Sequence, residues 1–334
     1  MRMKKKVMLY GFLCLLLTLL PLLPAKLLTE NRKAPEEPEK IPEEVTETEI
    51  PAEEKYYHVL DSETGEIMEV SVREYLIGAV GAEMPVTFEE EALKAQAVAA
   101  HTYAERQAEL SDRRPELKGA DFSDDASQYQ AFYTKEELKK LYNNNFDSYY
   151  ARLERVVDSV LHEVIMYQDE PIIAAFHAMS GGRTESAKNV WGSEVVYLQS
   201  VESRADETAP QFEQTVSYTA EEVREMLTAA REGLFLGTDT EHWFGEPEYS
   251  EAGTVMQIAV GTSIFTGQEL RNIFSLRSAI FSIKYEDKKF IFTTRGYGHD
   301  VGMSQYGANA MAADGADYKE ILAYYYPETE IKKI

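Results

Sequence analysis

The stretch SVREYLIGAVGAEMPVTFEEEALKAQAVAAHTY, residues 71–103, decides the fold of this chain, because it contains start and stop signals for two helices. Ser71 and Glu74 form a capping box, so the first helix is expected to begin there. Its apolar positions share one face: Val72, Leu76, Ala79 and Val80. The same spacing continues to Glu83, and Pro85 then stops the helix. A carboxylate is therefore expected at the end of an apolar stripe.

The second helix is expected to open at another capping box, formed by Thr87 and Glu90. One face carries mostly small residues that let another element approach closely: Leu93, Ala97, Ala100 and Ala104. Glu89 and Glu90 are interpreted as structural, because acidic residues are favoured in the first turn by the helix dipole. Glu91 has a different azimuth and is in a position to face Glu83 across the corner between the helices.

Glu83 is the candidate for acid–base chemistry. Burial beside apolar groups raises the pKa of a carboxyl group, because the charged form loses its hydration. A glutamic acid that stays protonated near neutral pH can act as a general acid. The alternative is a helix-end glutamate that is bonded to nearby backbone and has no chemical role.

The composition excludes several classes of protein. The 334 residues carry a formal net charge of −24, which argues against binding to a nucleic-acid backbone. The single cysteine, Cys14, lies in the N-terminal apolar stretch, so an intramolecular disulfide or a cysteine-based zinc site in the remainder of the chain is excluded.

The N-terminus is expected to anchor the chain in a membrane. Basic residues at positions 2–6 precede the apolar stretch from Val7 to Ala25, and we predict a transmembrane anchor over residues 1–28. A cleaved signal peptide is the alternative, but it usually has a shorter apolar region and an A-x-A-like site. Residues 29–55 are rich in glutamate and proline and are predicted to be a disordered stalk. A folded domain on the extracytoplasmic side is then expected over residues 56–334.

Four blocks of sequence resemble one family. The first, Gly81–Tyr103, contains Ala-Glu-Met-Pro at residues 82–85. The others are Phe176–Glu185 with Val190 and Trp191, then Tyr197–Val201, and Gly296–Ala308. Together these blocks, in this order, resemble the stage II sporulation protein D family of lytic transglycosylases, over nearly all of residues 56–334.

The resemblance implies an activity. Members of this family cut the MurNAc–GlcNAc bond of peptidoglycan without water and leave a 1,6-anhydro-MurNAc end. The family acid falls on Glu83 and a second motif carboxylate falls on Glu91. The implied substrate is glycan already stripped of stem peptides, and the implied setting is engulfment of the forespore, with the anchor in the mother-cell membrane. The implied partners are an amidase like stage II sporulation protein P and a membrane protein like stage II sporulation protein M.

Two positions depart from the family pattern. His101 stands where relatives usually have arginine, so any part it plays in holding substrate would rest on a weaker, pH-dependent charge. Asp300 replaces a glycine, and aspartate tolerates a left-handed backbone better than most residues. Some relatives hold zinc through cysteine and histidine, which residues 121–133 lack here, so we predict no metal and no other cofactor.

The remaining blocks are expected to line the substrate groove. Residues 172–176 are predicted to form a buried strand that leads into a loop with Ser180 and Gly181. His299 and Gln305 are predicted to hydrogen-bond sugar hydroxyls. Tyr197, like Trp191 and Tyr297, is suited either to stack on a sugar face or to pack in the core.

The expected fold class is α+β, with helices around residues 71–110, more strand after Val164, and two lobes that flank a groove. Two further functions stay open. One is a catalytically silent relative, because the same domain resembles amidase enhancers, which bind the wall or an amidase. The other is a membrane-tethered adhesion module, which would explain the stalk but not Ala-Glu-Met-Pro.

Overall fold

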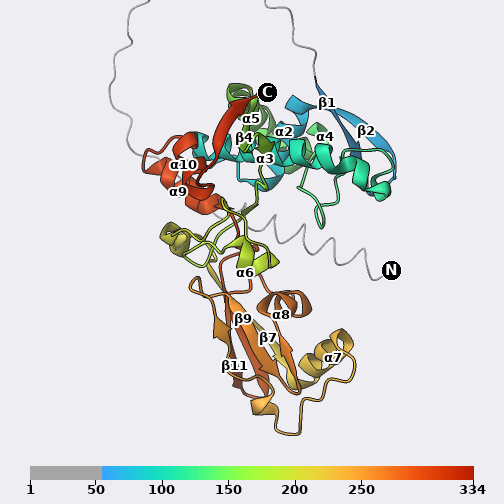
Figure 1. Cartoon of the computed structure of the whole chain (residues 1–334), viewed down its shortest axis with the longest axis vertical. Helices are drawn as coiled ribbons and strands as arrows, with labels where there is room; N and C mark the ends of the chain where they lie inside the picture. Colours follow the sequence, from blue (N-terminus) through green and yellow to red (C-terminus); the bar gives the residue numbers. More distant parts are fainter. Residues whose placement is uncertain (1–54) are drawn as a thin grey trace, which may run out of the picture. The chain divides into compact units, whose positions relative to one another are not determined.

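Helix α3 (Glu90–Leu110) is the central element of the first of two hydrophobic cores (Figure 1). The computed structural model describes residues 55–334, so the predicted anchor and the stalk up to residue 54 lie outside the described residues. Within that range no helix is both long enough and apolar enough to cross a bilayer. The described residues form a mixed α+β fold of helices and several small sheets, as the fold-class prediction expects.

Several elements pack around α3. They are α2 (Val72–Glu83), α5 (Phe146–Val160), α9 (Gln305–Ala313), α10 (Tyr318–Tyr325) and β4 (Glu163–Tyr167). The small residues of α3, among them Ala97 and Ala100, are fully buried and allow this close approach on several sides. Helices from both ends of the described chain therefore meet on α3.

The first capping signal is confirmed and the second is corrected. The Ser71 side chain accepts a hydrogen bond from the Glu74 N–H at 3.2 Å, and α2 ends at Glu83. Thr87 does not cap α3, because the helix begins only at Glu90 and its N-cap, Glu89, makes no side-chain capping bond. The Glu89 N–H instead donates to the Asn309 side chain of α9 at 2.7 Å. A tertiary contact thus takes the place of the predicted local cap.

Small sheets border the first core. One sheet has the order β2 (Ile67–Ser71), β1 (Tyr56–Leu60), β3 (Phe122–Ser123), and another has β14 (Glu330–Lys333), β4, β5 (Glu170–Pro171). Short strands β6 (Phe176–His177) and β13 (Met303–Ser304) pair in parallel. The continuous strand predicted over residues 172–176 is wrong: only residues 170–171 and 176–177 pair as strands, and the Ala175 N–H turns back to the Ile173 carbonyl.

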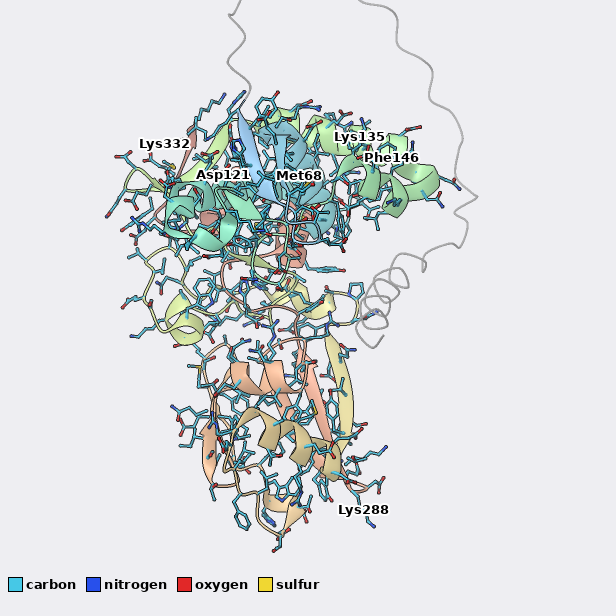
Figure 2. The ribbon with its side chains drawn as sticks, turned by 90° about the vertical axis from the view of Figure 1, so that its right-hand side faces the viewer. Met68, Asp121, Lys135, Phe146, Lys288 and Lys332 are labelled. Atoms are coloured by element: carbon cyan, nitrogen blue, oxygen red, sulfur yellow. The ribbon has the colours of Figure 1, made fainter. Side chains whose placement is uncertain are left out.

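The second core belongs to the segment from β7 (Glu213–Thr219) to β12 (Lys289–Arg295). One antiparallel sheet has the order β11 (Phe281–Glu286), β12, β7, and a second has β10 (Ser263–Phe265), β9 (Val255–Val260), β8 (Glu248–Tyr249). Helices α7 (Ala220–Ala230) and α8 (Gly267–Ile273) contribute Leu227 and Leu270 to this core. Figure 2 shows Lys288 on the turn that joins β11 and β12, and Met68 and Phe146 among the elements of the first core.

Candidate functional site

Glu83 is the last residue of α2 and is half-buried at the point where three helices and a loop meet. Its carboxylate accepts a hydrogen bond from the Ala131 N–H at 3.1 Å and another from the Gln305 side chain at the start of α9. Gln305 also donates through Nε2 to the Gln96 Oε1 of α3 at 3.3 Å. Gln96 is fully buried, so the amide pair links the Glu83 carboxyl to the centre of the first core.

Two tyrosines complete the surroundings of Glu83. Tyr75 lies two turns earlier on α2 and is fully buried, and Tyr103 lies about two turns beyond Gln96 on α3. Burial raises the pKa of both hydroxyls, that of Tyr103 to about 12, and the nearby charge of Glu83 adds to the rise. Both hydroxyl groups therefore stay protonated and uncharged at physiological pH.

The environment gives Glu83 an unusual acidity. Burial raises its pKa to about 7, although the hydrogen bonds from Ala131 and Gln305 act in the opposite direction. Near neutral pH the group is therefore divided between the protonated acid and the carboxylate. Such a group is able to donate a proton in one step of a reaction and accept one in the next.

The Glu91 carboxylate makes hydrogen bonds to residues other than Glu83 and its partners. One of its oxygens accepts from Lys94 Nζ at 2.7 Å, and the other accepts from the Tyr318 N–H at 3.0 Å, at the start of α10. A carboxylate in this place holds α3 and α10 together and satisfies a free amide at a helix N-terminus. These contacts give Glu91 a structural role, and its predicted part in substrate binding stays a prediction.

His101 is buried on a different face of α3. It lies five positions after Gln96, which places it about 140° further round the helix. Its Nδ1 lies 3.1 Å from the Glu163 carbonyl of β4, and its Nε2 lies 3.5 Å from a Glu105 oxygen. Burial alone would raise the pKa of Glu105, but hydrogen bonds from His101, Lys55 and Tyr57 lower it to about 2. The structure thus places His101 in a buried polar cluster, and its predicted contact with substrate is untested.

Ser180 belongs to a buried network around Asp206, which the sequence analysis missed. The Ser180 N–H and hydroxyl both donate to Asp206 Oδ2, at 2.8 and 2.6 Å, and the Ser304 hydroxyl donates to Oδ1 at 2.8 Å. Asp206 thereby ties the loop after β6 to the start of α9. Gly181 is half-buried and lines a separate pocket together with Tyr249, Ile280 and Arg295.

The aromatic candidates divide into buried and exposed rings. Tyr197 is buried, packs against Tyr167 at 5.3 Å between ring centroids, and accepts a hydrogen bond from the Ile173 N–H at 3.1 Å. Trp191 and Tyr297 are 43% and 48% exposed. Of the three rings, the two exposed ones are therefore available to stack on a ligand.

His299 is hydrogen-bonded to backbone groups on two segments. Its Nδ1 accepts from the Val301 N–H at 3.1 Å, and the ring also hydrogen-bonds the backbone of Phe176. Burial and the charge of Arg271 lower its pKa to about 4, so the imidazole is neutral. The hydrogen bonds to sugar hydroxyls predicted for His299 would therefore have to replace these backbone contacts.

Asp300 adopts the left-handed backbone expected for a residue in the place of a glycine, with φ of 67°. Its side chain is buried, and Oδ1 has no hydrogen-bond partner among the described residues. Within residues 55–334, no group of three or more histidine, cysteine or acidic side chains is placed to hold a metal ion.

Gln96 and the Ala131 N–H are the site groups that sequence reasoning missed. A glutamine between alanines, on a helix expected to be buried, is a signal for Gln96, because a buried amide needs partners. A backbone N–H from a loop leaves no such signal, since any residue provides one.

Comparison with known proteins identifies relatives of this chain. The sequence model of a family described as SpoIID, stage II sporulation protein, matches residues 60–167. Stage II sporulation protein D of Bacillus subtilis is 36% identical over 265 residues, which cover 79% of this chain and 75% of that protein. The protein of the same name from Bacillus amyloliquefaciens is 34% identical, with 79% and 75% covered. An amidase enhancer of Bacillus subtilis is 25% identical over 77% of this chain and 40% of its own length.

Proposed function

This chain belongs to the stage II sporulation protein D family, whose members are involved in sporulation, and we propose that it is a lytic transglycosylase of peptidoglycan with Glu83 as its single acid and base. The observation that carries the proposal is the Glu83 carboxyl group, which is half-buried, has a pKa of about 7 and is held by Ala131 and Gln305.

The reaction needs one group that first gives and then takes a proton. Protonated Glu83 donates its proton to the glycosidic oxygen as the bond from that oxygen to C1 of MurNAc breaks. The C6 hydroxyl of the same MurNAc then bonds to C1, and the Glu83 carboxylate accepts the hydroxyl proton. The products are a free GlcNAc end and a 1,6-anhydro-MurNAc end, and Glu83 is again protonated. No water is consumed, so no second carboxylate is needed to activate one.

The arrangement around Glu83 supports this use of one carboxyl group. Hydrolytic glycosidases generally use two carboxyl groups that flank the scissile bond. Glu91, the second motif carboxylate, is held by Lys94 and by the Tyr318 N–H. Gln305 and the Ala131 N–H fix the orientation of the Glu83 carboxyl group, so its proton is presented in one direction.

A second candidate function is a wall-binding or amidase-enhancing protein without catalysis. The similarity to an amidase enhancer favours it, at a lower identity than the similarity to stage II sporulation protein D. The two functions differ in whether glycan strands are cut, so one experiment separates them.

We also propose the cellular setting. The N-terminal anchor would hold the domain on the extracytoplasmic face of the mother-cell membrane, where engulfment of the forespore takes place. The substrate would be glycan strands whose stem peptides have been removed by an amidase like stage II sporulation protein P. A membrane protein like stage II sporulation protein M would complete the assembly.

The test compares the full chain with its Glu83→Gln variant on peptide-free glycan strands, with products read by mass spectrometry. We expect 1,6-anhydro-MurNAc ends from the unaltered chain and none from Glu83→Gln. Glu91→Gln is the matched control, and it is expected to retain the anhydro product if the protein stays folded. Strands that are bound but left intact by the unaltered chain would support the amidase-enhancer function. Reducing ends would instead show a hydrolase.

A further inference from the structure

Two half-buried arginines lie near the exposed Tyr297 ring, and both are far from Glu83 along the chain. They are Arg271, in the last turn of α8, and Arg277, in the loop that follows. Among residues 55–334, no carboxylate oxygen lies within 4.0 Å of either guanidinium group, although acidic residues outnumber basic ones by 58 to 34 in the whole chain. Partly buried arginines normally have such partners, so this pair is a feature that requires an explanation.

Arg277 is fixed in place without losing its charge. Its guanidinium lies 4.4 Å from the centroid of the Tyr297 ring, and its Nη1 donates to the Gln211 carbonyl at 2.7 Å. The charge of Arg277 also lowers the pKa of Tyr306, against the larger effect of burial, so the two groups are neighbours. Tyr306 directly follows Gln305, which hydrogen-bonds Glu83. Arg277 thus contacts Tyr297, and its charge acts on Tyr306, the residue that follows Gln305 in the sequence.

Arg271 is the second arginine of this region, in the last turn of α8. No hydrogen bond from its guanidinium to any residue in 55–334 is found, and its charge acts on Asp300, Tyr297, His177 and His299. Two buried atoms in this neighbourhood also lack partners within the described range: Asp300 Oδ1 and His177 Nε2. The region thus holds several polar groups whose hydrogen-bonding capacity is unused.

The exposed rings complete a binding surface. Trp191 contacts the His299 ring at 5.7 Å between centroids, and His299 is hydrogen-bonded to the backbone of Val301 and Phe176. His299 in turn contacts His177 at 5.7 Å. The contact with His299 thus fixes one side of the Trp191 ring, while 43% of the residue remains exposed. Tyr297 is 48% exposed. Rigid, exposed aromatic faces suit the apolar faces of sugars, and unpaired guanidinium groups suit carboxylates, which they bind through two parallel hydrogen bonds.

We propose that Arg271, Arg277, Tyr297 and Trp191 form a second saccharide-binding site, which recognises a carboxylate carried on a sugar of the strand that enters the Glu83 site. This inference rests on the proposed function for the identity of the strand. The ring faces hold the sugar, and the two guanidinium groups select for the free acid. A sugar whose carboxylate is blocked as an amide would lose that selection.

The test measures binding and not cleavage, so its outcome is separate from that of the proposed activity. The full chain carrying Glu83→Gln is titrated calorimetrically with three probes: glycan strands with free lactyl carboxylates, the same strands converted to methylamides, and neutral chitooligosaccharides. We expect the carboxylate strands to bind about tenfold more tightly than the methylamides, as is typical of charged hydrogen bonds. Salt should weaken only the carboxylate strands. Equal binding of the carboxylate and methylamide strands would overturn the proposal.

Single variants assign the effect to residues. Arg271→Gln and Arg277→Gln are each expected to remove most of the preference for carboxylate over methylamide strands, whereas Trp191→Ala should weaken both strands alike. Arg224→Gln is the matched control, because Arg224 also lies over an aromatic ring, Trp243 at 4.8 Å, but on α7 in the second core. Retention of the preference in both arginine variants, with their thermal unfolding unchanged, would refute the assignment.

Arginine binds both carboxylates and phosphates well. A polyol phosphate polymer is therefore used as a competitor, to show which of the two anions this site prefers. We expect it to displace the carboxylate strands only weakly, because it lacks sugar faces for Trp191 and Tyr297. Tighter, arginine-dependent binding of the phosphate polymer than of the carboxylate strands would show that the site is built for phosphate and would overturn the carboxylate assignment.

Discussion

At the scale of single residues, the acidity of Glu83 results from two opposing effects. Burial raises its pKa to about 7, while the hydrogen bonds from Ala131 and Gln305 lower it. If Glu83 must be protonated to cleave the strand, kcat/KM should be constant below pH 7 and should fall about tenfold for each pH unit above it. The Glu83 pKa therefore sets the upper pH limit of the proposed activity.

Gln305→Ala tests this balance. Loss of a hydrogen bond that favours the charged form raises the pKa of Glu83, so the falling limb of the pH–rate profile should move to higher pH. The maximal rate should fall as well, because the carboxyl group loses one of its two fixed partners. Gln96→Ala is the control: it removes only the partner of Gln305 and should shift the limb less. An unmoved limb in Gln305→Ala would show that the limb belongs to another group.

Asp300 is a residue where ionisation should reduce stability. Burial raises its pKa well above the usual value, so its folded-state pKa exceeds its unfolded-state pKa. The folded protein then holds the proton more tightly, and stability falls as pH rises from about 4 through the folded-state pKa. Asp300→Asn removes this dependence and keeps a residue that tolerates the φ of 67°.

We therefore expect Asp300→Asn to increase the free energy of unfolding at pH 7, because the folded protein then no longer has to hold a proton that the unfolded chain releases. The difference should shrink towards pH 4, where the aspartate is protonated in both states. Urea unfolding at several pH values measures both quantities. A variant that is less stable than the unaltered chain at pH 7 would show that burial does not keep Asp300 protonated in the folded protein.

At the scale of elements, α2 carries a glycine that determines how the Glu83 loop packs. A Cβ atom at Gly78 would lie 2.2 Å from the Tyr133 carbonyl oxygen and 2.5 Å from the Phe132 ring. In an ordinary helix, replacing glycine with alanine stabilises the helix by about 1 kcal/mol. At Gly78 the added Cβ atom would instead clash with residues 132 and 133, which directly follow Ala131 in the chain.

Gly78→Ala is expected to destabilise the chain by about 1–3 kcal/mol and to move the Ala131 N–H away from Glu83. Gly81→Ala in the same helix is the matched control, because its Cβ would meet the flexible Leu138 and Tyr142 side chains at 2.8 and 3.1 Å. Thermal unfolding and activity of both variants check the prediction. Equal effects at both positions would mean that the loop yields as easily as the side chains do.

Local sequence signals are sufficient to predict the ends of a helix only where the groups that end it are its own sequence neighbours. The capping box at Ser71 and the proline at 85 predict both ends of α2, because the groups that end this helix are its own neighbours. Thr87 has the same local signal but does not cap α3, since the Glu89 N–H bonds Asn309, 220 residues further along the chain. Glu83 was identified from helical spacing and the family resemblance, whereas its partners Ala131 and Gln305 come from distant segments that spacing does not relate.

At the scale of the whole molecule, the two hydrophobic cores are made by different stretches of chain. The buried residues of the first core come from segments 57–198 and 301–326, and those of the second from segment 223–292. The second core is thus an insertion between two parts of the first. Cores that share few buried side chains are able to unfold separately, and a single two-state transition is then not expected.

Trp243 provides a reporter for one of these cores. The chain has two tryptophans: Trp191, which is exposed, and Trp243, which is buried in the second core and stacked on Phe290 at 5.6 Å. In a Trp191→Phe background, fluorescence follows the second core alone, while far-UV circular dichroism is dominated by the helices of the first.

Leu227→Ala should shift the fluorescence transition and Leu93→Ala the dichroism transition, each by the equivalent of about 2–5 kcal/mol. If both probes move together in both variants, the cores unfold as one cooperative unit.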